Sequence, residues 1–140
     1  IEDNRDSYEV QVEKFRELFF DACRLRMRSD VPIGTALSGG LDSSAVAAAM
    51  KYNAGMFQRE IKPGWQNAFV ATFRGTELDE TEYAQSVVDS LGLRGFFSEI
   101  DPAKGFENLD QALWYFEELY LTSPIPMMEI YRSIKSNGIT

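Results

Sequence analysis

The sequence lacks histidine and contains a single cysteine, Cys23, among its 140 residues. Without histidine, a Cys/His catalytic pair and a histidine-ligated zinc site are both excluded. One cysteine cannot form an internal disulfide, which fits the reducing cytoplasm where we expect the protein to work. Because Cys23 lies within an amphipathic helical pattern, we expect it to be a core residue rather than a nucleophile.

Basic residues are also scarce. The chain has 14 Lys and Arg against 22 Asp and Glu, a formal net charge of −8, and its basic residues are scattered. We therefore expect neither nucleic acid nor an anionic membrane as a partner. No apolar run reaches the roughly 18 residues that suggest a membrane-spanning helix, so we expect a soluble protein. The remaining composition, 44% hydrophobic and 26% charged, is typical of a globular domain.

Helical and strand-like patterns alternate along the chain. Helical segments repeat apolar residues three and four positions apart, whereas strand-like segments are short, apolar and bounded by turn residues. The predicted helices cover residues 7–29, 43–51, 79–91, 102–116 and 127–136. The predicted strands cover residues 33–37, 68–73 and 95–100.

Several residues predict where these segments begin and end. Asp79 and Glu82 form the pattern of a capping box at the start of a helix. Pro124 and Pro126 are expected to break the helix that precedes them. The polar, glycine-containing segment 52–67 is the best candidate for a mobile loop.

Strands separated by single helices predict an open parallel sheet with helices on both faces. This is a doubly wound α/β fold, and a fourth strand is expected to start at Ile139 and Thr140. In such sheets ligands bind beyond the carboxyl ends of the strands. The turn that follows the first strand, residues 38–44, lies at such an end.

That turn reads Ser38-Gly39-Gly40-Leu41-Asp42-Ser43-Ser44. Glycines allow a ligand to approach the backbone closely, and the first N–H groups of a helix have no intrahelical acceptor. Together they predict an anion site, with phosphate as the expected anion. The turn is neither a Rossmann G-x-G-x-x-G nor a Walker motif, because it lacks the third glycine and the Gly-Lys pair. A capped turn without any ligand is the structural alternative.

The turn resembles the pyrophosphate loop of the ATP pyrophosphatase superfamily, whose members cleave ATP between the α- and β-phosphates. Segments around it resemble the synthetase domain of glutamine-dependent asparagine synthetase. These segments are Arg26-Met27-Arg28-Ser29-Asp30-Val31-Pro32-Ile33-Gly34, Leu41-Asp42-Ser43-Ser44, Leu78-Asp79-Glu80 and Ser123-Pro124-Ile125-Pro126-Met127-Met128. The resemblance extends from about Phe15 to the end of the chain.

The resemblance implies an incomplete Rossmann-like sheet of the adenine nucleotide alpha hydrolase type. Residues 1–140 would form one partial synthetase domain. The amino-terminal glutaminase domain of family members and the carboxyl-terminal remainder of their synthetase domain would be absent from it. The implied reaction is adenylation of aspartate by ATP, with release of pyrophosphate, followed by amide formation with ammonia. ATP and Mg²⁺ are the implied cofactors, and the fragment alone is expected to be inactive.

The resemblance also assigns site residues, none of them catalytic. Pyrophosphate and magnesium would be held by Ser38, Gly39, Gly40, Asp42, Ser43 and Ser44, with Asp42 as the metal ligand. Leu37 would border the nucleotide, and the adenine would be lined by Ala71, Thr72 and Phe73.

Alternatives to asparagine synthesis remain open. Residues 91–95 lack a histidine that family members often carry there, so the acceptor could be another carboxylate. Relatives that form β-lactams, cyclise peptides or amidate sugars use the same adenylation. A nucleotide-binding module without catalysis is a second alternative, and a tRNA-modifying enzyme is disfavoured by the negative charge. Self-association into a homo-oligomer is also compatible with the sequence.

Overall fold

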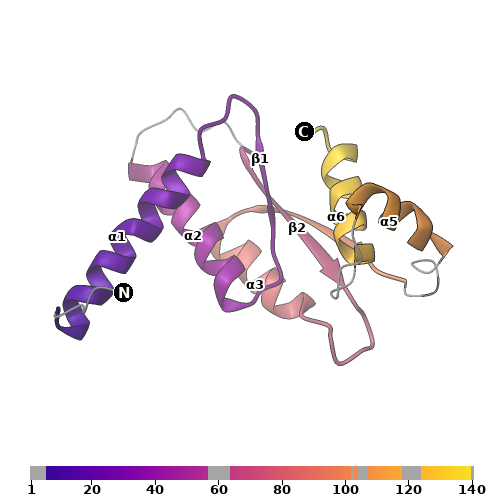
Figure 1. The fold of residues 1–140 in the computed structure, drawn as a ribbon, viewed down its shortest axis with the longest axis horizontal. Helices are drawn as coiled ribbons and strands as arrows, with labels where there is room; N and C mark the ends of the chain where they lie inside the picture. Colours follow the sequence, from indigo (N-terminus) through magenta and orange to yellow (C-terminus); the bar gives the residue numbers. More distant parts are fainter. Residues whose placement is uncertain (1–5, 57–63, 102, 104–106, 118–123, 140) are drawn as a thin grey trace.

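The computed structural model describes residues 6–56, 64–101, 103, 107–117 and 124–139. Helices and strands alternate along the described chain as far as the third strand, and two helices follow, as the sequence predicts (Figure 1). In chain order the elements are α1 (Tyr8–Arg26), β1 (Ile33–Ala36), α2 (Leu41–Met56), β2 (Gln66–Thr72), α3 (Thr81–Leu91), β3 (Arg94–Glu99), α5 (Leu109–Phe116) and α6 (Pro124–Ser136).

The strands form one parallel sheet in the order β1-β2-β3. In its register Ala36 of β1 pairs with Phe69 of β2, which pairs in turn with Phe96 of β3. Since the strands run in the same direction, their carboxyl ends lie at one edge of the sheet. Single helices, α2 and α3, connect them in succession.

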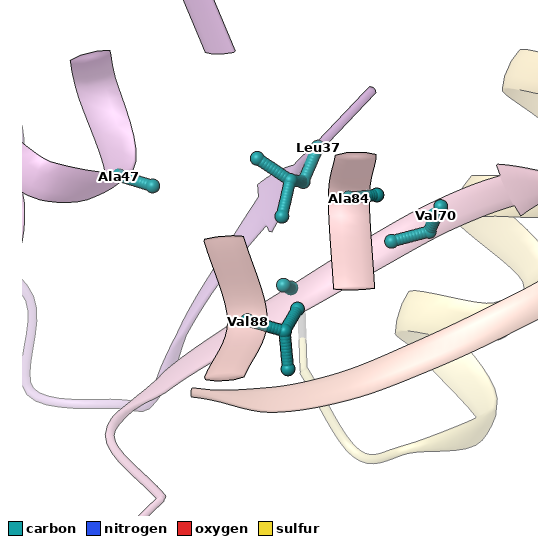
Figure 2. Close-up of a cluster of buried hydrophobic side chains, with 6 residues drawn as sticks. Leu37, Ala47, Val70, Ala84 and Val88 are labelled. Carbon is teal, nitrogen blue, oxygen red and sulfur yellow. The ribbon is translucent and has the colours of Figure 1, made fainter. Parts of the chain in front are cut away.

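Two buried clusters lie on opposite faces of the sheet, because successive side chains of β2 point to alternate faces. The cluster under α2 and α3 consists of Leu37, Ala47, Ala68, Val70, Ala84 and Val88 (Figure 2). The cluster under α6 consists of Phe69, Ile130 and Ile139. Helices therefore cover both faces (Figure 1), which confirms the predicted open α/β sheet of Rossmann-like type.

The prediction of a long polar loop at 52–67 was wrong at both ends. Helix α2 continues to Met56, and β2 begins at Gln66. The polar residues that suggested a loop are buried and hydrogen-bonded: Asn53 Nδ2 donates to the Phe20 carbonyl at 2.8 Å, and Gln66 Nε2 donates to the Ala47 carbonyl at 3.1 Å. A buried amide with a partner is compatible with a helix or a strand. The middle of the predicted loop, 57–63, lies outside the described residues.

Two predicted helix starts also need correction. The residue that precedes α3 as its N-cap is Glu80, and its side chain makes no capping hydrogen bond, so the predicted Asp79/Glu82 box does not form as such. Helix α6 begins at Pro124, with Pro126 also in its first turn. Proline is tolerated there because the first N–H groups of a helix need no intrahelical acceptor. The predicted helix over 102–116 begins outside the described residues; just before it, the Asp101 carboxylate accepts a hydrogen bond from the Ala103 N–H at 3.0 Å.

The remaining expectations concern Cys23, the fourth strand and membrane spans. Cys23 is buried, as predicted for a core residue, and burial raises the pKa of its thiol above the ordinary value. Ile139 is buried in the cluster under α6, and Thr140 lies outside the described residues, so the fourth strand stays a prediction. Among the helices that the structure describes, none has the length and apolarity needed to cross a membrane.

Replacing Asn53 by alanine is expected to destabilise the protein by about 1–3 kcal/mol, because it removes the buried side-chain hydrogen bond that joins α2 to the Phe20 carbonyl of α1 and leaves the space of the amide unfilled. Urea unfolding of the two proteins measures the difference. Lys51→Ala, an exposed change on the same helix, is the control and is expected to stay within about 0.5 kcal/mol of the wild type. Equal midpoints for Asn53→Ala and Lys51→Ala would contradict the assigned role of the hydrogen bond.

Candidate functional site

The glycine and serine turn lies at the carboxyl end of β1, where the sequence places it. Leu37 continues the strand, since its N–H donates to the Phe69 carbonyl at 2.9 Å, and its side chain is buried in the cluster under α2 and α3. Ser38, Gly39 and Gly40 then reverse the chain, and α2 begins at Leu41. The strand end and the helix start are thus separated by only a few residues, which directs the amino terminus of α2 towards the carboxyl edge of the sheet.

Two serine side chains give the turn its shape. The Ser43 hydroxyl accepts a hydrogen bond from the Ser38 N–H at 3.2 Å and donates to the Gly40 carbonyl at 3.3 Å. The Ser38 hydroxyl lies 3.0 Å from the Ser43 hydroxyl and accepts from the Gly40 N–H at 3.2 Å. These hydrogen bonds all lie within residues 38–43 and hold the turn in one conformation. Part of the hydrogen-bonding capacity of the Ser38 and Ser43 hydroxyls is therefore used within the turn.

Gly39 packs against the first turn of α3. Its φ of +87° lies in the left-handed region, which side chains other than glycine rarely adopt. A Cβ atom on Gly39 would lie 2.4 Å from the Ala84 nitrogen and 2.7 Å from the Tyr83 carbonyl carbon. Both the backbone conformation and the close approach of α3 therefore require glycine at this position.

Hydrogen-bond donors collect at the start of α2. The N–H groups of Leu41, Asp42 and Ser43 occupy the first turn, where a helix provides no acceptor. The Ser44 hydroxyl is buried, and within the part of the chain that the structure describes it has no hydrogen-bond partner. A buried hydroxyl without a partner is unfavourable by roughly 1–3 kcal/mol, so an unpaired one at a helix amino terminus suits an anion with several oxygens.

The side chains around the turn fit a magnesium ion only together with phosphate. Asp42 is exposed in the first turn of α2. Within the described ranges, no three Asp, Glu or Cys side chains gather in a way that could hold a metal by themselves. Mg²⁺ typically uses one or two carboxylates together with phosphate oxygens and water, and Asp42 beside an anion site matches that arrangement.

The predicted adenine residues lie at the carboxyl end of β2, on the same edge of the sheet as the turn. They do not share one face: Ala71 packs with the cluster under α6, whereas Thr72 is 1% exposed and its hydroxyl donates to the Ser98 carbonyl at 3.4 Å. The Phe73 carbonyl accepts from the Thr76 N–H at 3.1 Å, which starts the turn into α3. The structure brings these residues to the same edge of the sheet as the turn, and the Thr72 hydroxyl is hydrogen-bonded to β3.

Asp79 organises the entry into α3. Its carboxylate accepts a hydrogen bond from the Thr81 N–H at 3.2 Å and a second one from the Thr81 hydroxyl. The Thr81 side chain is the main reason why the pKa of Asp79 lies below its ordinary value, with smaller effects from backbone N–H groups and Arg74. Asp79 therefore anchors the start of the helix.

The contact of Tyr83 and Ala84 with Gly39 was missed by sequence reasoning. The apolar face of α3 correctly predicts that Ala84 is buried. Nothing local in the sequence indicates which backbone it touches, because Gly39 and Ala84 come together only when α2 and α3 pack side by side on the sheet.

Fold and turn together define an open parallel α/β domain whose first strand leads through a glycine and serine turn into a helix. A sequence model of the asparagine synthase family matches residues 14–140, and the chain belongs to that family.

Individual relatives agree with this assignment. Asparagine synthetase (glutamine-hydrolyzing) 1 of Bacillus subtilis (strain 168) is 28% identical over 90% of this chain and 19% of its own length. Asparagine synthetase (glutamine-hydrolyzing) 2 of Oryza sativa subsp. japonica is 29% identical over 89% of this chain and 21% of its own length. Amidase chry2 of Gibberella zeae is 28% identical over 75% of this chain and 16% of its own length. The chain thus spans about a fifth of the length of these relatives.

Proposed function

We propose that the chain is the ATP-binding part of an ATP-dependent amide ligase of the asparagine type. The carboxylate of aspartate attacks the α-phosphate of ATP, pyrophosphate leaves, and ammonia then displaces AMP from the acyl adenylate to form the amide. The observation that carries the proposal is the buried Ser44 hydroxyl, which has no hydrogen-bond partner among the described residues and lies beside the amino terminus of α2, at the carboxyl end of β1. Membership of the asparagine synthase family supports the reaction class.

The turn acts by positioning and by electrostatics in this proposal. The first N–H groups of α2 and the Ser44 hydroxyl donate to the oxygens of the departing pyrophosphate, as the electropositive end of a helix favours. Gly40 lets the phosphates approach the backbone, Gly39 lets the turn pack against α3, and the Ser38 and Ser43 hydroxyls hold the turn in shape and add donors.

The nucleotide and the metal complete the proposed site. Leu37 borders the nucleotide, and residues 71–73 at the end of β2 line its adenine. Asp42 would hold a magnesium ion, which supplies positive charge that neutralises the pyrophosphate as it leaves. In the full-length protein we expect residues 1–140 to form part of one synthetase domain, with ammonia supplied by a glutaminase domain.

Asp42→Asn is expected to lower ATP-dependent pyrophosphate release by the full-length protein by about 100-fold or more, an effect typical of losing a group that stabilises developing charge. The change keeps the size of the side chain and removes the negative charge that would bind magnesium. Release is measured with ATP, magnesium, aspartate and ammonia, at several magnesium concentrations. Because metal binding is weakened, more magnesium is expected to restore part of the rate.

Asp110→Asn is the matched control for this substitution. Asp110 follows Leu109 in the first turn of α5, just as Asp42 follows Leu41 in the first turn of α2, and both aspartates are exposed. A rate close to wild type is expected for Asp110→Asn. Unchanged release in Asp42→Asn would refute the metal role, and a wild-type protein that releases no pyrophosphate from ATP would refute the proposed function.

The acceptor carboxylate is tested in the same assay. Similarity to Amidase chry2 as well as to asparagine synthetases means that the family match by itself does not fix the acceptor. We expect AMP to form with aspartate and to depend on its side-chain carboxylate, so that asparagine gives no AMP. AMP formation with a different carboxylate and none with aspartate would reassign the substrate while leaving the adenylation step in place.

A further inference from the structure

We propose that the first turn of α3 positions the phosphate-binding turn, with Ala84 as the positioning residue. The inference rests on the proposed function, because it concerns the geometry of the same anion site. It arises from a tertiary contact between α3 and Gly39, two parts of the chain that are more than 40 residues apart.

The backbone of α3 forms the surface against which Gly39 rests. The Cβ position of Gly39 is 2.4 Å from the Ala84 nitrogen and 2.7 Å from Tyr83 atoms, so not even a methyl group fits between turn and helix. The Ala84 N–H itself donates to the Glu80 carbonyl at 3.1 Å within the helix. Gly39 therefore packs closely against a regular helix. The helix backbone at Ala84 cannot move away from Gly39 without breaking the hydrogen bond from the Ala84 N–H to the Glu80 carbonyl.

Ala84 also fixes how far α3 lies from the turn. Its side chain is 0% exposed and belongs to the cluster with Leu37, the residue before Ser38, and Ala47, which lies on α2 beyond Ser44 (Figure 2). The same residue thus lies against Gly39 with its backbone and is buried in this cluster with its methyl group. A smaller residue would let α3 settle towards the sheet and change the position of Gly39.

The start of α3 is held in turn by the segment after β2. Asp79 anchors Thr81 through two hydrogen bonds, and the Phe73 carbonyl accepts from Thr76, so β2, this segment and α3 are tied together. Because the proposed adenine residues end β2, α3 links the two parts of the nucleotide site. Groups that bind phosphate contribute most to affinity when they are already held in the binding geometry before the ligand arrives.

The test compares three substitutions in the full-length protein. Ala84→Gly is expected to lower kcat/KM for ATP by about 10- to 100-fold, mainly through KM, since small displacements of positioning groups have effects of this size. It is also expected to weaken the binding of magnesium pyrophosphate in calorimetry by about tenfold. Ala84→Ser keeps the Cβ atom and is expected to restore both quantities to within about twofold of wild type.

Val88→Ala separates positioning from stability. Val88 lies one turn further along α3 in the same cluster, so its truncation removes more buried surface than Ala84→Gly while leaving the residues at Gly39 in place. We expect Val88→Ala to lower the unfolding temperature at least as much as Ala84→Gly and to leave KM for ATP and pyrophosphate affinity unchanged.

Two results would overturn the positioning role: an unchanged pyrophosphate affinity in Ala84→Gly, or an equal loss of affinity in Val88→Ala. The calorimetric measurement distinguishes this failure from failure of the proposed function. A wild-type protein that binds magnesium pyrophosphate in an Ala84-dependent manner but releases none from ATP would retain the positioning role and refute the ligase activity.

Discussion

Gly39→Ala is expected to reduce ATP-dependent pyrophosphate release by the full-length protein by at least about 100-fold. The added methyl group would lie 2.4 Å from a backbone nitrogen of α3, a distance at which one of the two segments must move. The φ of +87° adds strain of about 1–3 kcal/mol for any residue other than glycine. Both effects displace the turn that we propose to bind the phosphates.

Gly138→Ala is the matched control for Gly39→Ala. Gly138 also has a positive φ, +74°, but among the described residues other than its chain neighbours no atom lies within 4 Å of its Cβ position. Both substitutions therefore introduce backbone strain, whereas only Gly39→Ala introduces a clash beside the turn. We expect Gly138→Ala to lose some stability and to keep its rate. Equal rates for the two variants would show that the contact with α3 does not matter for the reaction.

Phe69→Ala is expected to destabilise the protein by about 3–5 kcal/mol, the usual cost of truncating a buried aromatic residue. Phe69 is 0% exposed at the centre of β2, and its ring stacks on that of Phe96 with centroids 4.9 Å apart. The ring also covers Gly34 of β1, whose Cβ position would lie 3.1 Å from it. Since a typical domain is stable by only about 5–15 kcal/mol, this substitution removes a large part of the total.

Urea unfolding measures this loss, and Phe69→Leu is the comparison. Leucine fills most of the same volume and is expected to cost less than half as much as alanine. A small effect of Phe69→Ala, below about 1 kcal/mol, would mean that the cluster under α6 contributes little to the fold, because few buried aromatic positions tolerate truncation so well.

The sequence predicts the layout of the fold well because its signals are local. Short apolar strands alternate with amphipathic helices, and that alternation alone implies a parallel sheet covered on both faces. The glycine and serine turn was placed correctly at the end of β1 for the same reason. The roles assigned to its residues stay predictions, since they come from the resemblance and not from a bound ligand.

The errors in the predicted loop arose where a tertiary contact overrides a local preference, whereas the error at Asp79 is local. Asn53 and Gln66 look like loop residues, but each donates to a backbone carbonyl of another element, which allows them to be buried in α2 and β2. Asp79 has the spacing of an N-cap, yet it lies one residue before the N-cap, Glu80, and accepts its hydrogen bonds from Thr81. The contact of Gly39 with α3 has no local signal at all.

The central place of β2 in the sheet has a consequence for the exchange of its backbone amide protons with heavy water. Strand β2 lies between β1 and β3, and all but one of its residues are buried. Its amide protons are divided between the two neighbours, so replacing all of them requires both strands to separate from β2, and those of β2 as a whole should be the last to be replaced. In β1, a strand of four residues, fraying next to residues 38–44 should expose amide protons much sooner. The segment that we propose to bind the phosphates would thus open and close many times during one lifetime of the folded sheet.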